Sequence, residues 1–147
     1  MANFWLYLAF GASILWGFAY ALSEKILKTG VSPAFAMVVS TIVVLPLYVA
    51  FAISNGSIKS GIQALSNSST ALWMLVVMAV CIAAGNLLIY QSISIKNATL
   101  ASMIEITYPL FTFIFAWLIM GQVQLTVSTA FGALLIFAGV AVMFFKG

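Results

Sequence analysis

Apolar residues dominate the chain in five stretches, each long enough to cross a lipid bilayer. A spanning helix needs about 20 mostly apolar residues. Five segments meet this requirement, near residues 3–22, 34–53, 71–92, 97–120 and 124–145. The pattern predicts an all-helical integral membrane protein with five transmembrane helices, arranged as one domain over residues 1–147.

Short polar segments separate the apolar stretches and indicate how the helices follow one another. Gly30 and Pro33 mark the first turn, and Pro33 is suited to begin the second helix because its φ angle is fixed near the helical value. The third and fourth connections, residues 96–98 and 121–124, are very short. The helices that they join are therefore expected to be antiparallel neighbours.

The second connection, residues 54–70, is the only long polar segment of the chain. Serine, asparagine and glycine are frequent in it, a composition typical of loops. We therefore expect a solvated loop. The alternative is that Ile62 and Leu65 lie on the membrane surface.

The composition agrees with a membrane protein and excludes several kinds of function. Hydrophobic residues make up 65% of the chain and charged residues 5%, far below the quarter that is typical of soluble domains. With no histidine, two acids and one cysteine, Cys81, the chain cannot build a metal site or a Ser-His-Asp triad by itself. We expect no enzymatic activity, no cofactor and no metal, and five lysines give no reason to expect nucleic-acid binding.

The distribution of lysines predicts the orientation of the chain in the membrane. Five spans place the two termini on opposite sides. One side then carries Lys25, Lys28, Lys96 and Lys146, and the other carries Lys59. Because lysines are enriched in cytoplasmic loops, we predict a multi-pass protein of the inner or plasma membrane with its N-terminus outside and its C-terminus in the cytoplasm.

Glu105 is the only acid in the second half of the chain, and it lies inside the fourth apolar stretch. An acid at the centre of a spanning helix costs about 2.5–3.5 kcal/mol on insertion scales, so its presence suggests a function. Pro109 follows four residues later and lacks the N–H that would bond to the Glu105 carbonyl, which predicts a helix break at the same level. The helix face around Glu105 is small or polar: Ala98, Ala101, Ser102, Tyr108, Pro109 and Thr112.

Two roles are open for Glu105. Removal from water favours the neutral form of a carboxyl group. Glu105 either binds and releases a proton or cation during transport, or stays protonated and hydrogen-bonds a neighbouring helix permanently. The opposite face of the same helix is bulky and apolar, and we expect it to contact lipid: Met103, Ile106, Leu110, Phe113 and Trp117.

Other polar and aromatic side chains near mid-membrane depth are candidate substrate- or proton-binding residues. Asn86 and Tyr90 share a stripe of the third helix. Asn86 either lines a cavity or forms an interhelical hydrogen bond, worth about 0.6–2 kcal/mol. Tyr108 and Thr112 on the fourth helix and Trp16 on the first complete the set. Trp16 and its neighbour Tyr20 either line a pocket or fill space.

Small residues at regular spacing predict close helix packing. The first helix carries a small residue at every fourth position: Ala9, Ser13, Gly17 and Ala21. Such stripes let two helix backbones approach closely. Gly132 and Gly139 lie seven positions apart on one face of the fifth helix and predict a second packing seam.

Several of these features together resemble a known family. They are the small residues at 98–102, Pro109, Gly121 at the helix end, and the paired Gly132 and Gly139. This pattern is similar to the carboxy-terminal part of an EamA-type domain of the drug/metabolite transporter superfamily. Leu-Trp-Gly at 15–17 and Gly-Val-Ser-Pro at 30–33 resemble the family's first helix and first loop. There are departures, because Gln122 stands where many members have Glu, and the second helix has Val39, Ser40 and Thr41 where many have Arg.

The resemblance implies a transport mechanism. Typical members have ten helices, built from two five-helix repeats of opposite orientation, and they exchange substrate by alternating access. This chain would be one repeat of that fold, working as a dimer with an inverted copy of itself or with an inverted paralogous partner. We expect a transporter subunit that moves a small metabolite or amphipathic compound, with exchange for protons as one option for its coupling.

Two rival functions are open. A small multidrug exporter of the four-helix kind has its essential acid in the first helix, where the predicted helix of this chain has none. A non-transporting scaffold subunit needs no acid at mid-membrane depth.

Overall fold

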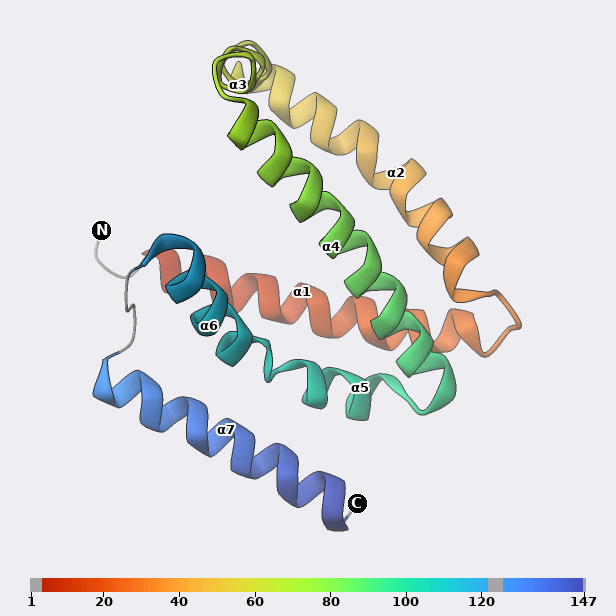
Figure 1. Ribbon diagram of the computed structural model, residues 1–147. Coiled ribbons are helices and arrows are strands. Elements are labelled where there is room, and N and C mark those ends of the chain that lie inside the picture. Colours follow the sequence, from red (N-terminus) through yellow and green to blue (C-terminus); the bar gives the residue numbers. More distant parts are fainter. Residues whose placement is uncertain (1–3, 122–125, 147) are drawn as a thin grey trace. The chain divides into compact units, whose positions relative to one another are not determined.

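The computed structural model describes residues 4–121 and 126–146, the side chain of Lys146 excepted. These residues form helices and no strand (Figure 1): α1 (Phe4–Leu27), α2 (Pro33–Ser54), α3 (Ser57–Ser66), α4 (Ser69–Ile95), α5 (Ala98–Glu105), α6 (Tyr108–Met120) and α7 (Val127–Lys146). Five segments within the described ranges are long and apolar enough to cross a membrane, with α5 and α6 together forming the fourth. The predicted all-helical fold with five spans is confirmed.

Two helices extend beyond the ends of their apolar stretches. α1 continues to Leu27 and α4 to Ile95, whereas the apolar pattern ends near residues 22 and 92. The length of an apolar stretch reflects the thickness of the hydrocarbon core of the membrane. The helix itself can continue into the headgroup region until a residue unfavourable for helix is reached. After α1 that residue is Gly30, whose φ of 94° is unfavourable for other residues.

The longer α1 contains Glu24, so the expectation that the first helix has no acid is wrong. Glu24 lies close to the helix end, and its Oε1 accepts a hydrogen bond from Lys28 Nζ at 2.5 Å. The pair is a salt bridge of the i, i+4 kind, with the Lys28 side chain 71% exposed. Glu24 is therefore a neutralised acid at a helix terminus and does not correspond to the mid-helix acid of a four-helix exporter.

The start of α2 follows its predicted chemistry. Ser32 Oγ accepts a hydrogen bond from the Phe35 N–H at 3.2 Å, which satisfies one of the unpaired donors of the first turn. Pro33 opens the helix, as predicted. A second proline, Pro46, lies inside α2 without ending it.

The expectation of a solvated loop over residues 54–70 is wrong, because Ser57–Ser66 is the helix α3. Gly56 has a φ of 71° and lets the chain turn sharply between α2 and α3. Ser57 N–H donates to Asn55 Oδ1 at 3.0 Å at this turn.

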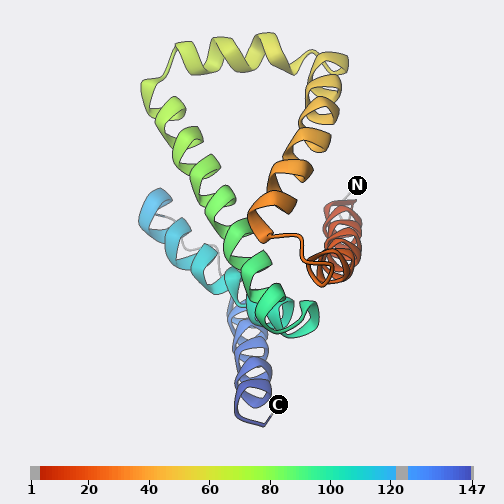
Figure 2. The same cartoon turned by 90° about the vertical axis from the view of Figure 1, so that its right-hand side faces the viewer.

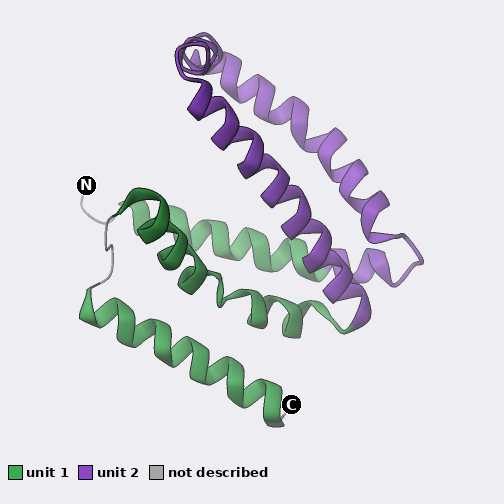
Figure 3. Cartoon of the chain, in the orientation of Figure 1, with its two compact units in different colours: residues 1–21, 96–147 green, residues 22–95 purple. Residues whose placement is uncertain are grey.

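The chain divides into two compact units, residues 1–21 with 96–147 and residues 22–95 (Figure 3). The first holds most of α1 with α5, α6 and α7. In the second, α2 and α4 converge at the start of α2 and diverge toward α3, which runs crosswise between them (Figure 2). A single domain over the whole chain stays a prediction.

Few side chains are buried in the described part of the chain. The buried hydrophobic residues are Tyr20, Leu27, Ile93, Ala98 and Ala101. Most large apolar side chains are exposed instead, such as Phe10 at 68% and Leu15 at 71%. This is the distribution expected where lipid covers the helices, because lipid tails are as apolar as leucine and drive no hydrophobic collapse between helices.

Candidate functional site

The fourth span is interrupted between Glu105, where α5 ends, and Tyr108, where α6 begins. At the interruption, backbone hydrogen bonds join residues three positions apart instead of the four positions of an α-helix. Thr107 N–H donates to the Ile104 carbonyl and Leu110 N–H donates to the Thr107 carbonyl, both at 3.1 Å. Bonds of this kind tighten the helix and commonly mark a local change of direction.

Proline alone does not explain this interruption, because α2 continues through Pro46. Pro109 cannot donate a hydrogen bond to the Glu105 carbonyl, since it has no N–H. Thr107 adds a second effect, because its Oγ1 donates to the Ile104 carbonyl at 2.9 Å, the same oxygen that accepts from its own N–H. A threonine side chain that competes for a backbone carbonyl is known to bend helices. Thr107 and Pro109 together account for the break.

The Glu105 carboxyl group has a hydrogen-bond partner on another helix. Tyr20 Oη, on α1, donates to Glu105 Oε1 at 2.9 Å. Tyr20 is 7% exposed, and Glu105 is half-buried. Both residues belong to the first unit, so this contact joins α1 to the end of α5 within one compact body.

Trp16 lies one turn before Tyr20 on α1 and extends this contact. The Trp16 and Tyr20 rings are 5.7 Å apart between centroids, at an interplanar angle of 45°. Trp16 is 53% exposed, so part of its ring is open to the surroundings. We call Trp16, Tyr20 and Glu105 the Glu105 cluster.

The Glu105 cluster differs electrostatically from the pair at the end of α1. Glu24 has Lys28 as its partner, whereas no salt bridge to Glu105 is found among residues 4–121 and 126–145. A carboxyl group has two oxygens and about four acceptor positions, of which the phenol uses one. The cluster can therefore accept a proton or a cation without breaking an ion pair.

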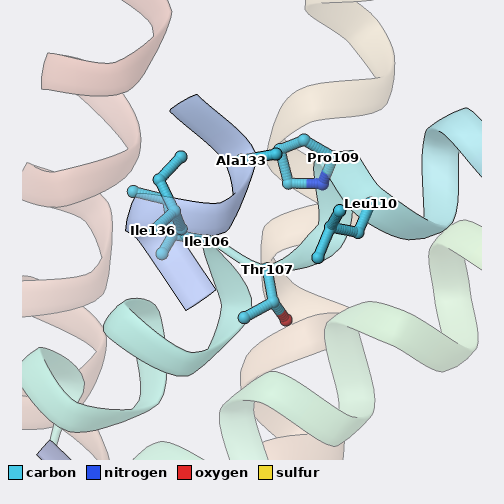
Figure 4. A pocket seen from close by; sticks show the side chains of 6 residues that line it. All are labelled: Ile106, Thr107, Pro109, Leu110, Ala133 and Ile136. Atoms are coloured by element: carbon cyan, nitrogen blue, oxygen red, sulfur yellow. The ribbon is translucent and has the colours of Figure 1, made fainter. Parts of the chain in front are cut away.

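The break also packs against α7 (Figure 4). A hollow of about 10 Å³ is lined by Ile106, Thr107, Pro109, Leu110, Ala133 and Ile136. This volume holds about one water molecule at most, so the hollow is too small for an organic substrate. The contact supports the break from the side of α7 but does not form a binding pocket.

A larger groove lies in the second unit, between α2 and α4. Its volume is about 470 Å³, within the range of small-molecule sites. The lining residues are Ala34, Met37, Val38, Thr41, Ile42, Ala83, Asn86 and Leu87. Two of them are polar, Thr41, whose Oγ1 donates to the Met37 carbonyl at 2.9 Å, and Asn86, which is half-buried.

The family of the chain is decided by a comparison with protein-family models. The model described as the EamA-like transporter family matches residues 3–145. The chain belongs to the EamA-like transporter family. A comparison with curated proteins found no significant match, and a comparison with solved structures found none either.

Membership of the EamA-like transporter family confirms the resemblance predicted from the sequence and identifies a membrane protein of the drug/metabolite transporter type. The five spans agree with that class. Gln122, one of the departures from the family pattern, lies outside the described residues, as does the predicted start of the fifth helix at residue 124.

Within the first unit, two other predicted site residues of this EamA-like chain, Tyr108 and Thr112, are not part of the Glu105 cluster. Tyr108 is 62% exposed, and Thr112 is exposed with its Oγ1 donating to the Tyr108 carbonyl at 3.1 Å. The prediction that they share a face with Glu105 assumed a continuous helix, and the span is interrupted between Glu105 and Tyr108. Asn86 and Tyr90 are half-buried on α4, in the other unit, and Tyr90 does not line the groove.

The glycines of the predicted packing stripes have open space beside them in the described part of the chain. A Cβ added to Gly17, Gly132 or Gly139 would meet no heavy atom within 4 Å. Ser13, on the same stripe as Gly17, is exposed, and its Oγ donates to the Ala9 carbonyl at 3.1 Å. Close packing at these positions stays a prediction, and it would require a second chain as the packing partner.

The partner of Glu105, Tyr20, was considered from the sequence only as a residue that lines a pocket or fills space beside Trp16, and its pairing with Glu105 was not predicted. The sequence does contain a signal for it, because a tyrosine inside a membrane-spanning stretch places a hydroxyl where water is scarce. A buried phenol usually has a hydrogen-bond partner. Glu105 is the acid available at mid-membrane depth, so the pairing could have been formulated as a hypothesis.

Proposed function

We propose that the chain is a subunit of a membrane transporter that moves a small metabolite or amphipathic compound, with Glu105 binding the coupling proton or a cationic substrate. The observation that carries the proposal is the hydrogen bond from Tyr20 Oη to Glu105 Oε1 at 2.9 Å, directly beside the break of the fourth span. Membership of a transporter family supports the general class.

The strength of the bond depends on the protonation of Glu105. A hydrogen bond to an ionised carboxylate is worth about 1.5–3 kcal/mol, and one between neutral groups about 0.5–1.5 kcal/mol. Binding of a proton or cation at Glu105 would therefore change how firmly α1 holds α5. Such a link between occupancy and helix contact is what alternating access requires, since a ligand moves an equilibrium only by binding its two states differently.

The exposed face of Trp16 supports a substrate with apolar or cationic character. An indole face attracts cations and provides apolar contact area. Trp16 is 53% exposed beside Tyr20, so a compound bound at Glu105 would be able to contact the ring. Asn86, Tyr90, Tyr108 and Thr112 stay second-rank candidates for substrate contact.

The proposed transporter is a dimer that moves its substrate by alternating access. The family resemblance implies two five-helix repeats of opposite orientation. The open stripe at Gly17 supports a second chain, because small residues at a spacing of four suit close helix approach. The partner is either an inverted copy of this chain or an inverted paralogous subunit.

We propose an orientation with the N-terminus outside and the C-terminus in the cytoplasm, in the inner or plasma membrane. Four of the five lysines then lie on the cytoplasmic side, and Lys59 lies outside. Labelling a single cysteine at Ser60 in intact cells, with Cys81 replaced by alanine, tests this orientation. Labelling by an impermeant reagent supports it, and labelling only after the cells are opened contradicts it.

Transport by purified protein in liposomes under an imposed pH gradient tests the central proposal. Substrates are found by screening small organic cations and neutral metabolites with the wild-type protein. Glu105→Gln keeps the shape and one acceptor oxygen but cannot ionise, so we expect it to lose pH-dependent uptake. Glu24→Gln is the matched control, because it removes the other acid of the chain at the end of α1, and we expect it to retain uptake.

Each result separates the proposal from its rivals. Full pH-dependent uptake by Glu105→Gln would refute the role of Glu105. Loss of uptake in Glu24→Gln with retention in Glu105→Gln would indicate a small multidrug type of mechanism at the first helix. A wild-type protein that moves no compound, together with a Glu105→Gln variant that differs only slightly in stability, would favour a scaffold subunit.

A further inference from the structure

The helix α3 is the one described helix that does not take part in a candidate span. It has ten residues, Ser57–Ser66, about half of what a spanning helix needs. Both of its ends connect closely to spans, to α2 through Asn55 and Gly56 and to α4 through Asn67 and Ser68. Figure 2 shows α3 running crosswise between the diverging ends of α2 and α4.

The sequence of α3 divides its surface into an apolar stripe and a polar face. Ile58, Ile62 and Leu65 follow one another at spacings of four and three, which places them on one side of a helix. Lys59, Ser60 and Gln63 lie on the opposite side. We call Ile58, Ile62 and Leu65 the α3 stripe.

The protein leaves much of the α3 stripe uncovered. Ile62 is 65% exposed and Ile58 is 40% exposed, while Leu65 is half-buried. Two isoleucines on one side of a polar helix would be unfavourable in water, because transfer of apolar surface from water is the main driving force of burial. Some apolar medium is expected to cover them.

We propose that α3 is an interfacial helix whose stripe inserts into the boundary between lipid headgroups and acyl chains. The position of α3 supports lipid as the occupant, because each of its ends is joined through two residues to a candidate membrane span. A short amphipathic helix lying in the plane of the interface is a known mode of membrane contact.

The charge of α3 agrees with this occupant. Its ten residues contain one cation, Lys59, and no acid. A lysine on the polar side can extend its ammonium group toward lipid phosphates while its carbon chain stays along the apolar boundary. The absence of acids within Ser57–Ser66 avoids repulsion from those phosphates.

An interfacial α3 would hold the diverging ends of α2 and α4 at the level of the membrane surface. The residues that line the groove between α2 and α4 come from the first half of α2, at 34–42, and from 83–87 of α4. α3 would then limit how far the two helices tilt during a cycle, acting as a lateral anchor for that unit. This consequence is independent of the role proposed for Glu105.

Fluorescence quenching tests the contact with lipid. The native Cys81 is exposed, so it is replaced by alanine, and an environment-sensitive fluorophore is attached to Ile62→Cys or, as the matched control, to Gln63→Cys. The labelled full-length chains are reconstituted into vesicles of phosphatidylcholine and phosphatidylglycerol. Iodide in the buffer quenches probes in water, and lipids carrying a nitroxide near the headgroup quench probes at the interface.

We expect the probe at position 62 to be quenched several-fold more by nitroxide lipid than the probe at position 63, and several-fold less by iodide. Equal and strong iodide quenching at both positions would overturn the proposal in favour of a solvated helix. Protection of position 62 from both quenchers would overturn it in favour of a protein contact, such as a second copy of the chain.

A second variant keeps the test independent of the labelled site. With the probe at Leu65→Cys, the change Ile62→Glu places a charge in the stripe, and we expect iodide quenching at position 65 to rise several-fold. Gln63→Glu places the same charge on the polar face and should leave the quenching unchanged. Identical quenching in both variants would contradict insertion of the stripe.

Discussion

The hydrogen bond between Tyr20 and Glu105 can be measured as a coupling free energy. Tyr20→Phe removes the phenol oxygen but keeps the ring, so the contact with Trp16 at 5.7 Å is expected to survive. Glu105→Met removes the carboxyl group and keeps a side chain of similar length. A double-mutant cycle of these two changes isolates the interaction between the two side chains.

The expected coupling follows from the geometry. At 2.9 Å from a phenol oxygen to a carboxyl oxygen, the bond has an ordinary length. The coupling free energy should be about 0.5–1.5 kcal/mol while Glu105 is protonated and about 1.5–3 kcal/mol when it is ionised. If Glu105 binds and releases a proton during transport, the coupling should be larger by roughly 1 kcal/mol at alkaline than at acidic pH.

Reversible unfolding in mixed micelles, followed by circular dichroism as denaturing detergent is added, provides the four free energies of unfolding. The control is a second cycle that starts from Glu105→Gln instead of wild type and compares it with Glu105→Met, each with and without Tyr20→Phe. Its coupling should not depend on pH, because an amide oxygen accepts the bond but cannot ionise. A coupling below about 0.3 kcal/mol at both pH values would refute the claim that the bond stabilises the fold. A coupling near 1 kcal/mol that does not change with pH would refute the proton-carrier role and leave a permanent structural bond.

Three further changes test other parts of the structure. Gly121→Ala should lower the free energy of unfolding by about 1–2 kcal/mol, because Gly121 ends α6 with a φ of 66°. The control Gly85→Ala, inside α4 with open space around it, should not lower the free energy of unfolding. Pro109→Ala restores an N–H and should slow amide hydrogen exchange at the break, whereas Pro46→Ala should not. Gly17→Ile should lower the dimer fraction measured by cross-linking in membranes, and Gly11→Ile, on the other side of α1, should not; equal dimer fractions would contradict packing at the Gly17 stripe.

The five spans could be predicted because the bilayer imposes a length and a composition that few other environments impose. The ends of α1 could not be predicted in the same way. Its apolar residues stop near residue 22, but nothing before Gly30 prevents the helix from continuing into the polar boundary. Hydrophobicity reports where lipid is, and helix termination depends on separate signals.

The helix α3 was missed although its signal is present in the sequence. Ile58, Ile62 and Leu65 follow the helical period, but the surrounding serines, asparagines and glycines favoured a loop. In this segment the spacing of three apolar residues was more informative than the overall polarity. An interfacial helix has this combination, because half of its surface is in water.

The candidate site was only partly predictable, for a reason of geometry. Glu105 stands out by chemistry alone, since an acid is rare in hydrocarbon. Tyr108 and Thr112 were assigned to its face by the period of a continuous helix, whereas the span is interrupted near Thr107, a feature that the period of apolar residues does not show. Tyr20 is 85 positions away in sequence from its partner, a separation that no local periodicity encodes.

The two acids of the chain show why the partner matters more than the acid. Glu24 is paired with Lys28, four positions later at the same end of α1, so this ion pair connects no second helix. Glu105 is paired with a neutral phenol, so the strength of its contact with α1 follows its own state of protonation. An acid held in this way can connect the binding of a proton or cation to the movement of a helix, because its partner lies on another helix. The Glu24–Lys28 pair joins two residues at one helix end and makes no such connection. The pH dependence of the Tyr20–Glu105 coupling therefore decides whether the bond takes part in transport or only holds α1 against α5.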